Sequence, residues 1–181
     1  MKGVVFNLLE EVVTRDYGDD AWDQVLEAAG LDGAYTSLGG YPDKDLFSLV
    51  GAASSALHKE PDEIVRWFGR ESLPMLAASY PHFFEPYSSA LPFVLTLNDI
   101  IHPEVRKIYP GADVPVFDFA TSGEVLLMGY QSERHLCSFA EGLIEGAADH
   151  YGEHATIAQP KCMKRGDEKC VLEIEFERNG G

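Results

Sequence analysis

Two groups of residues in this chain have the types and spacing that ligand binding requires. His102 follows the apolar run 95–101, so its imidazole lies at the end of a predicted helix, beside an apolar face. Tyr130, Ser132 and Arg134 alternate along a segment that the pattern predicts to be extended. Because residues i, i+2 and i+4 of a strand point to one side, we expect a phenol, a hydroxyl and a guanidinium group to converge.

That second group suits a ligand with paired carboxylates. A guanidinium group binds a carboxylate through two parallel hydrogen bonds, and the two hydroxyls add neutral donors. Each group also has a purely structural interpretation. A histidine near an apolar face often packs or caps a helix, and Arg134 alone would be an ordinary exposed arginine at a strand edge.

The first half of the chain has the 3,4 spacing of apolar residues that is typical of helices. It predicts helices over these ranges: 3–16, about 19–29, 42–57, from 62 onward with Pro74 as a kink or restart, and 88–101. We expect the last of these helices to end at His102.

The second half changes period and predicts strands. Residues 115–119 and 124–130 read as a hairpin, 133–151 as a helix, and 170–178 as a strand paired with one near 154–159. The fold class is therefore α+β, with a helical N-terminal half packed on a C-terminal half that holds a small antiparallel sheet and helices. We expect one domain, with a helical subdomain over about 1–65 and a sheet subdomain over about 66–181.

Composition excludes several classes of function. A net charge of −16 argues against binding nucleic acid or an anionic membrane surface. No phosphate-binding glycine loop, serine elbow or zinc-protease motif is present, so no reaction is indicated and we expect a protein that is not an enzyme. The three cysteines and the absence of a signal peptide point to a reducing cytoplasm.

The order and spacing of the motifs carry a family resemblance. His102, then Tyr109-Pro-Gly-Ala-x-x-Pro115, then Tyr130-x-Ser132-x-Arg134, closely resembles the H-NOX family of haem nitric oxide/oxygen-binding domains. These are bacterial relatives of the haem domain of soluble guanylate cyclase. The resemblance extends over nearly the whole chain, from the N-terminal Met-Lys-Gly to the final strand.

The resemblance implies a role for each matching residue. His102 would be the axial ligand of the iron in haem b (iron protoporphyrin IX), and Pro115 would press on the porphyrin and distort it. Three residues would hold the haem propionates: Tyr130, Ser132 and Arg134. Four apolar residues would cover the distal face: Val5, Leu9, Phe139 and Leu143.

The resemblance also bears on which gas is bound. Oxygen-binding members carry a distal tyrosine where this chain has Phe139, and Ser72 is the only polar residue that we place near the pocket. We therefore expect a sensor that binds nitric oxide, with carbon monoxide as a second gas, and excludes O₂. Nitric oxide would release His102, and a separate signalling protein would read the change: a histidine kinase or a cyclic-di-GMP enzyme (diguanylate cyclase or phosphodiesterase). Docking could use the acidic face formed by Glu173, Glu175 and Glu177.

The cysteines leave a further alternative open. Cys137, Cys162 and Cys170 resemble a zinc site of three cysteines and one histidine found in part of the family, but the expected histidine position is Gln159. His154 lies at an odd offset on the same predicted strand and should face the other way. The thiols could instead act as a redox switch. The alternative for the whole protein is a haem-free zinc/cysteine module of the vinyl-reductase-like type.

Overall fold

Four helices make up the first part of the chain. The computed structural model describes residues 1–178, and in it α1 spans Gly3–Tyr17, α2 Asp19–Ala29, α3 Asp43–Leu57 and α4 Pro61–Ser79. A capping box of Glu60 and Glu63 begins α4, with Pro61 at the first helical position. Pro74 lies inside α4, so the expected restart is wrong: the helix continues to Ser79.

The segment that carries His102 is more irregular than the sequence pattern predicts. After the short 3₁₀ turn η1 (Pro81–Phe83) come α5 (Ala90–Val94), a π-helical turn η2 (Leu97–Ile101) and α6 (His102–Ile108). His102 therefore begins a helix, where we expected it to end one. α6 accommodates Pro103 because a proline is tolerated in the first turn of a helix, where its missing N–H is little needed.

The second part builds the sheet around one long helix. The strands are β1 (Val116–Ser122), β2 (Val125–Gln131), β3 (Glu153–Lys161) and β4 (Cys170–Arg178), with α7 at Cys137–His150 and the 3₁₀ turn η3 at Met163–Arg165. All neighbours are antiparallel, in the order β1-β2-β4-β3. The predicted strands and the α+β class are confirmed.

The helix after β2 starts later than the sequence pattern predicts. Residues 132–136 form a turn and not a helical end, and His135 has a left-handed φ of 54°. This turn allows α7 to begin at Cys137 and run back across the sheet.

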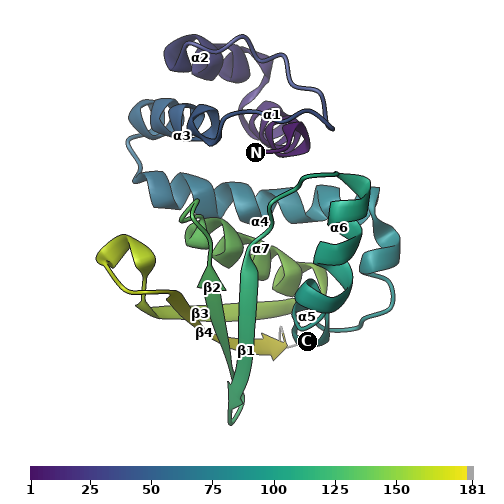
Figure 1. Ribbon diagram of the computed structural model, residues 1–181. Coiled ribbons are helices and arrows are strands. Elements are labelled where there is room, and N and C mark those ends of the chain that lie inside the picture. Colours follow the sequence, from purple (N-terminus) through teal and green to yellow (C-terminus); the bar gives the residue numbers. More distant parts are fainter. Residues whose placement is uncertain (179–181) are drawn as a thin grey trace.

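The molecule is layered (Figure 1): α1, α2 and α3 lie on one side of α4, and α7 lies between α4 and the sheet. One hydrophobic cluster fills the space among α1–α3 and the first half of α4 up to Phe68. A second begins at Leu73 and fills the space between α4, α7 and the sheet. Because α4 serves both clusters, the expected subdomain boundary near residue 65 falls inside a single helix.

Glycines let α4 and α7 approach closely. A Cβ atom on Gly142 would lie 2.0 Å from the Arg66 carbonyl oxygen, and one on Gly69 would lie 2.4 Å from the Phe139 carbonyl oxygen. An ion pair between Arg66 and Glu145 (2.6 Å) also joins the two helices. α4 and α7 are therefore packed tightly against each other.

None of the helices within residues 1–178 combines the length and the apolar character that crossing a membrane requires.

Candidate functional site: a buried histidine in a large apolar cavity

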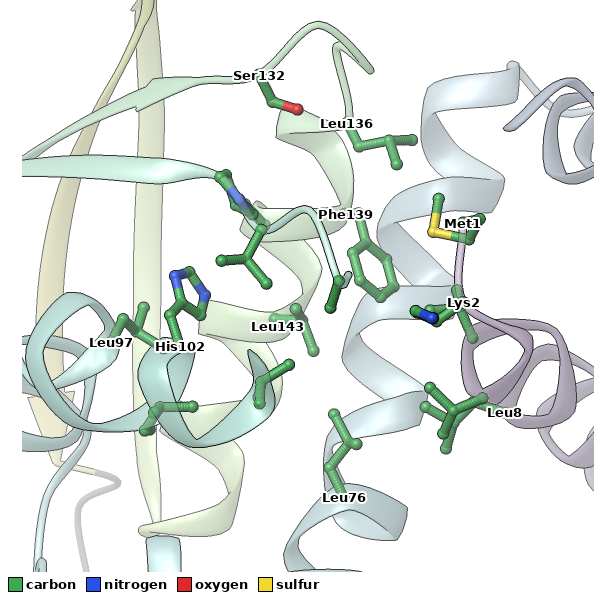
Figure 2. A pocket seen from close by; sticks show the side chains of 18 of the residues that line it. Met1, Lys2, Leu8, Leu76, Leu97, His102, Ser132, Leu136, Phe139 and Leu143 are labelled. Carbon is green, nitrogen blue, oxygen red and sulfur yellow. The ribbon is translucent and has the colours of Figure 1, made fainter. Parts of the chain in front are cut away.

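A cavity of about 670 Å³ opens between α1, α4, α6, α7 and the start of β1. In Figure 2, His102 enters from one side, Lys2 and Leu8 lie on the other, and Phe139 and Leu143 line the space between. Most of the lining is apolar. A volume of this size is within the range of small-molecule and cofactor sites, which bury most of the ligand.

His102 is neutral in its surroundings. Burial and, to a smaller extent, the nearby Arg106 charge lower its pKa, the Pro115 carbonyl opposes them, and the resulting pKa is about 4. The imidazole ring lies 5.4 Å from the Phe117 ring, centroid to centroid. Its Nδ1 is buried and has no hydrogen-bond partner among the described residues. A neutral imidazole with an unpaired buried nitrogen is a suitable metal ligand.

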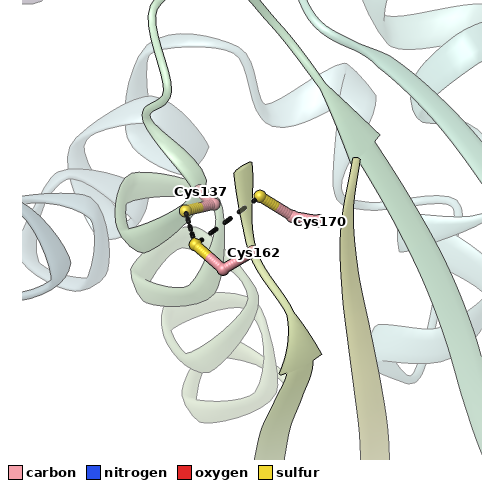
Figure 3. Close-up of side chains that lie close together, drawn as sticks. All are labelled: Cys137, Cys162 and Cys170. Atoms are coloured by element: carbon pink, nitrogen blue, oxygen red, sulfur yellow. Dashed lines mark hydrogen bonds between the residues drawn. The ribbon is translucent and has the colours of Figure 1, made fainter. Parts of the chain in front are cut away.

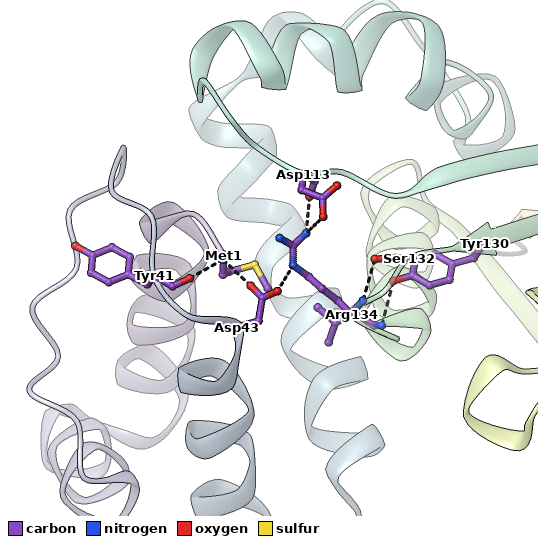
Figure 4. Close-up of polar contacts among 8 residues, drawn as sticks. Met1, Tyr41, Asp43, Asp113, Tyr130, Ser132 and Arg134 are labelled. Carbon is purple, nitrogen blue, oxygen red and sulfur yellow. Dashed lines mark hydrogen bonds and ion pairs between the residues drawn. The ribbon is translucent and has the colours of Figure 1, made fainter.

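Tyr130, Ser132 and Arg134 all line one edge of this cavity. The extended-strand argument for their convergence is wrong, because β2 ends at Gln131 and the other two residues lie in the turn that follows. The turn itself brings them together (Figure 4): the Tyr130 hydroxyl accepts a hydrogen bond from the Leu136 N–H (3.0 Å), and the Ser132 hydroxyl accepts one from the Arg134 N–H (3.3 Å).

Two carboxylates that sequence reasoning missed hold Arg134. Its Nε donates to Asp43 (2.7 Å), and its Nη1 lies 2.9 Å from an Asp113 carboxylate oxygen. Asp43 also accepts from the Met1 amino group (2.5 Å), as Figure 4 shows. Burial alone would raise the pKa of Asp43, but the Met1 and Arg134 charges outweigh it and hold the pKa below its usual value. No local pattern could reveal these partners, because they are distant in sequence.

The wall formed by α1, α4 and α7 is apolar. The lining residues from these helices all have apolar side chains: Val4, Val5, Leu8, Val65, Phe68, Leu73, Leu76, Phe139, Ala140, Leu143, Ile144 and Ala147. Leu9 is not among them, in contrast to the sequence-based expectation, because one further residue along α1 turns it into the cluster with α2 and α3. Ser72 is also outside the lining, and its hydroxyl donates to the Phe68 carbonyl (2.7 Å).

A pair of tyrosines lines the cavity between α4 and α6. The Tyr80 and Tyr109 hydroxyls lie 2.5 Å apart, and burial raises the pKa of Tyr109 well above its usual range. Tyr109 begins the motif Tyr-Pro-Gly-Ala-x-x-Pro, whereas nothing near Tyr80 in sequence indicates that it pairs with Tyr109. The two phenols satisfy each other's hydrogen bonding.

The three cysteines gather away from this cavity (Figure 3). The Cys162 sulfur lies 3.8 Å from that of Cys137 and 3.9 Å from that of Cys170, and all three side chains are buried. Burial raises the pKa of Cys170 to about 12. Gln159 has a buried Nε2 with no partner among the described residues, and His154 is exposed. Within residues 1–178, no His, Asp or Glu joins the three sulfurs as a fourth ligand.

The cavity residues fit a haem. A neutral imidazole with an unpaired buried nitrogen faces an apolar space, and the donors suited to two carboxylates lie together at one edge. A neutral imidazole, donors for two carboxylates and an apolar pocket are the elements by which proteins bind haem.

Comparison with known proteins agrees with this fit. The family model for haem-NO-binding domains matches residues 2–159. An H-NOX protein from Shewanella oneidensis, solved in the Fe(II)NO state, is 32% identical, with a TM-score of 0.91 over 98% of this chain and all of that one. The unliganded Fe(II) H-NOX protein from K. algicida is 26% identical, with a TM-score of 0.87 over 99% of this chain and 98% of that one.

A curated relative is much longer than the matched region. Soluble guanylate cyclase gcy-32 of Caenorhabditis elegans is 31% identical over 71 residues, which are 38% of this chain and 10% of that protein. The family match, by contrast, extends over most of the chain, and the fold agrees over nearly all of it. The chain belongs to the haem-NO-binding family, the H-NOX domains, which bind haem and serve as gas sensors.

Proposed function

We propose that this protein is a haem-based sensor of nitric oxide that does not bind O₂ and signals to a separate protein. One observation carries the proposal: neutral His102 faces a cavity whose α1, α4 and α7 lining residues are all apolar. The iron of a bound haem b supplies the site at which the gas binds. Carbon monoxide, which also binds without a hydrogen-bond donor, is a second expected ligand.

The residues of the chain have distinct tasks in this proposal. His102 would ligate the haem iron, and burial keeps its imidazole neutral. Tyr130, Ser132 and Arg134 orient the propionates, with Asp43 and Asp113 keeping the guanidinium group in place. Pro115, which also lines the cavity, would press on the ring and favour a distorted shape. The apolar wall excludes water.

Selectivity depends on what the apolar wall lacks. Bound O₂ carries negative charge on its outer oxygen and gains from a hydrogen-bond donor, whereas nitric oxide does not need one. A hydrogen bond to a charged group contributes about 1.5–3 kcal/mol, which changes relative affinity by about tenfold to a hundredfold. Val5, Phe139 and Leu143 offer no such donor.

Signalling follows from release of His102. With nitric oxide bound, the haem iron would no longer hold His102, and the helical turns that carry it would be free to move against the rest of the fold. The domain itself performs no reaction in this proposal. A cytoplasmic histidine kinase, or a diguanylate cyclase or phosphodiesterase, reads the change. Glu173, Glu175 and Glu177 are exposed along β4, and their acidic face is suited to docking a basic partner surface.

A nitric oxide titration tests the proposal. The ferrous, haem-loaded protein is mixed with stoichiometric nitric oxide, and its visible spectrum should change from that of histidine-ligated haem to that of five-coordinate haem–NO. A protein that does not retain haem, or that keeps the histidine ligand with nitric oxide bound, would contradict it. A protein that remains colourless when produced with ample haem would favour the haem-free alternative.

For the three cysteines we propose a structural zinc site, separate from gas binding. Three buried thiols within reach of one ion support a zinc site, although structural zinc normally has four protein ligands. Metal analysis of the purified protein, with Cys170→Ala as control, tests this assignment. One zinc per chain that is lost in the variant supports it, whereas a metal-free protein whose thiols form a disulfide reversibly supports the redox switch instead.

A further inference from the structure

The turn just before His102 is a π-helix, which is rare and concentrates at functional sites. The Ile101 N–H donates to the Thr96 carbonyl (3.2 Å), and the His102 N–H donates to the Leu97 carbonyl, so both hydrogen bonds reach back five residues. Such a turn is wider than an α-helical turn. The turn itself contains no proline or glycine, but Pro103 follows it and cannot donate a hydrogen bond to the Asp99 carbonyl four residues earlier. A side-chain contact also favours the wider turn over a regular helix.

Asn98 supplies a contact of this kind. Its side-chain Nδ2 donates to the Phe117 carbonyl (2.6 Å), and its Oδ1 accepts from the Phe117 N–H (3.3 Å). One amide side chain therefore pairs with both backbone polar groups of a single residue in β1. β1 is an edge strand, and these groups of Phe117 point away from β2, so Asn98 occupies the place that a further strand would take.

The same residue of β1 also contacts the histidine. Asn98 and His102 are four residues apart and share one face of the helical segment, and the His102 ring lies beside the Phe117 ring. Phe117 is buried, and its ring also lies 6.0 Å from that of Tyr130 on the neighbouring strand. The position of the imidazole is thus fixed relative to the sheet at two points, through the Asn98 amide and through the aromatic contact.

We propose that Asn98 is a positioning residue for His102: it holds the π-turn on the free edge of β1 and so sets where the imidazole points in the cavity. The inference rests on the proposed function, because positioning matters only if His102 is the axial ligand. Without the two hydrogen bonds between Asn98 and the Phe117 backbone, the turn can relax, and His102 would be held less firmly against the iron.

Two variants remove the hydrogen bonds between Asn98 and Phe117 in different ways. Asn98→Leu keeps a side chain of similar shape without polar groups, and Asn98→Ala removes the side chain beyond Cβ. Asp99→Ala is the matched control, since Asp99 lies in the same turn and is exposed. The first readout uses the haem-free protein: hydrogen exchange of the Phe117 amide should become about tenfold faster in both Asn98 variants and stay unchanged in the control.

The second readout is the iron–histidine stretching band of the ferrous protein, measured by resonance Raman spectroscopy. In both Asn98 variants the band should shift to lower frequency, and nitric oxide should release His102 several-fold faster than in the wild type. General destabilisation alone would not shift this band. If the Asn98 variants match Asp99→Ala in exchange and band position, the inference is overturned. If the wild type shows no iron–histidine band, the proposed function fails instead.

Discussion

The two walls of the cavity are built by different means. The wall with His102, Tyr130, Ser132 and Arg134 carries the polar groups of the proposed site among apolar side chains, and it comes from a π-turn, a proline-containing first turn and the loop after β2. The wall opposite comes mainly from regular positions of α1, α4 and α7, whose lining side chains are all apolar. Lys2, just before α1, also lies on this side, and its ammonium group donates to the Leu38 carbonyl (3.2 Å). Irregular backbone therefore places the groups that hold a ligand, and regular helix packing provides the surface that excludes water.

The difference shows where the domain can vary. Side chains on the apolar wall project from helices that pack through Gly69 and Gly142, so one of them can change without moving the support. On the polar wall, each group depends on partners from distant segments, as Arg134 depends on Asp43 and Asp113. In the proposed function, gas selectivity therefore depends on single side chains, whereas haem binding depends on a network of contacts.

The largest expected effect comes from removing the axial group. His102→Ala should abolish stable haem binding during purification, because the iron loses its protein ligand and the remaining contacts are apolar or at the edge. Visible spectroscopy measures the haem retained, and added imidazole should restore the histidine-type spectrum. Leu143→Ala, on the opposite wall, is the control and should keep the axial band. Equal haem retention in His102→Ala and wild type would be inconsistent with the assigned role.

The next effect is a gain of function on the apolar wall. Phe139→Tyr adds a hydroxyl to a residue that lines the cavity, and a new donor to charged O₂ should raise O₂ affinity by roughly tenfold or more. The spectrum of the ferrous protein in air measures this change, with Phe139→Leu as the control that adds no donor. If neither variant differs from wild type, Phe139 does not face the bound gas.

A smaller effect is expected at the cavity edge. Arg134→Ala removes one of three propionate contacts and leaves Asp43 and Asp113 without their shared partner. Transfer of haem to an acceptor globin should become several-fold faster, while the axial spectrum remains that of wild type. Arg134→Lys keeps the charge but not the planar guanidinium group, so its rate of haem transfer should lie between those of the wild type and Arg134→Ala. Transfer at the wild-type rate in both variants would remove Arg134 from the site.

The smallest effect is a pH dependence of stability. The pKa of Asp43 is held below the usual 3.8, so its stabilising contribution is fully present above that pH and is lost as pH falls through the lower folded-state pKa. The difference in unfolding free energy between wild type and Asp43→Asn should therefore shrink below about pH 4. Chemical denaturation of the haem-free proteins at pH 7 and near pH 3 provides the comparison, and a constant difference would contradict it.

Much of the fold could be predicted from the sequence, because the relevant signals are local. Helical spacing located α1 to α4, and the alternation of Leu172 and Ile174 with glutamates located β4. The π-turn and α6 could not be predicted in this way, since hydrogen bonds to Thr96 and Leu97 that reach back five residues leave no simple period.

In the candidate site too, local features could be predicted from the sequence and contacts between distant segments could not. The spacing of Tyr130, Ser132 and Arg134 is visible in the sequence, and the structure places all three on the cavity. Their actual geometry comes from a turn, and the partners of Arg134 come from segments about 20 and 90 residues away. Leu8, and not Leu9, lines the cavity, because one residue along a helix is a rotation of about 100°.

The most direct test of the central claim is the visible spectrum of the ferrous, haem-loaded wild-type protein in air-saturated buffer. If the α1, α4 and α7 side chains opposite His102 offer bound O₂ no donor, the spectrum should stay that of unliganded, histidine-ligated ferrous haem, apart from slow oxidation, and should change promptly when nitric oxide is added. A stable O₂-bound spectrum in air would contradict the account.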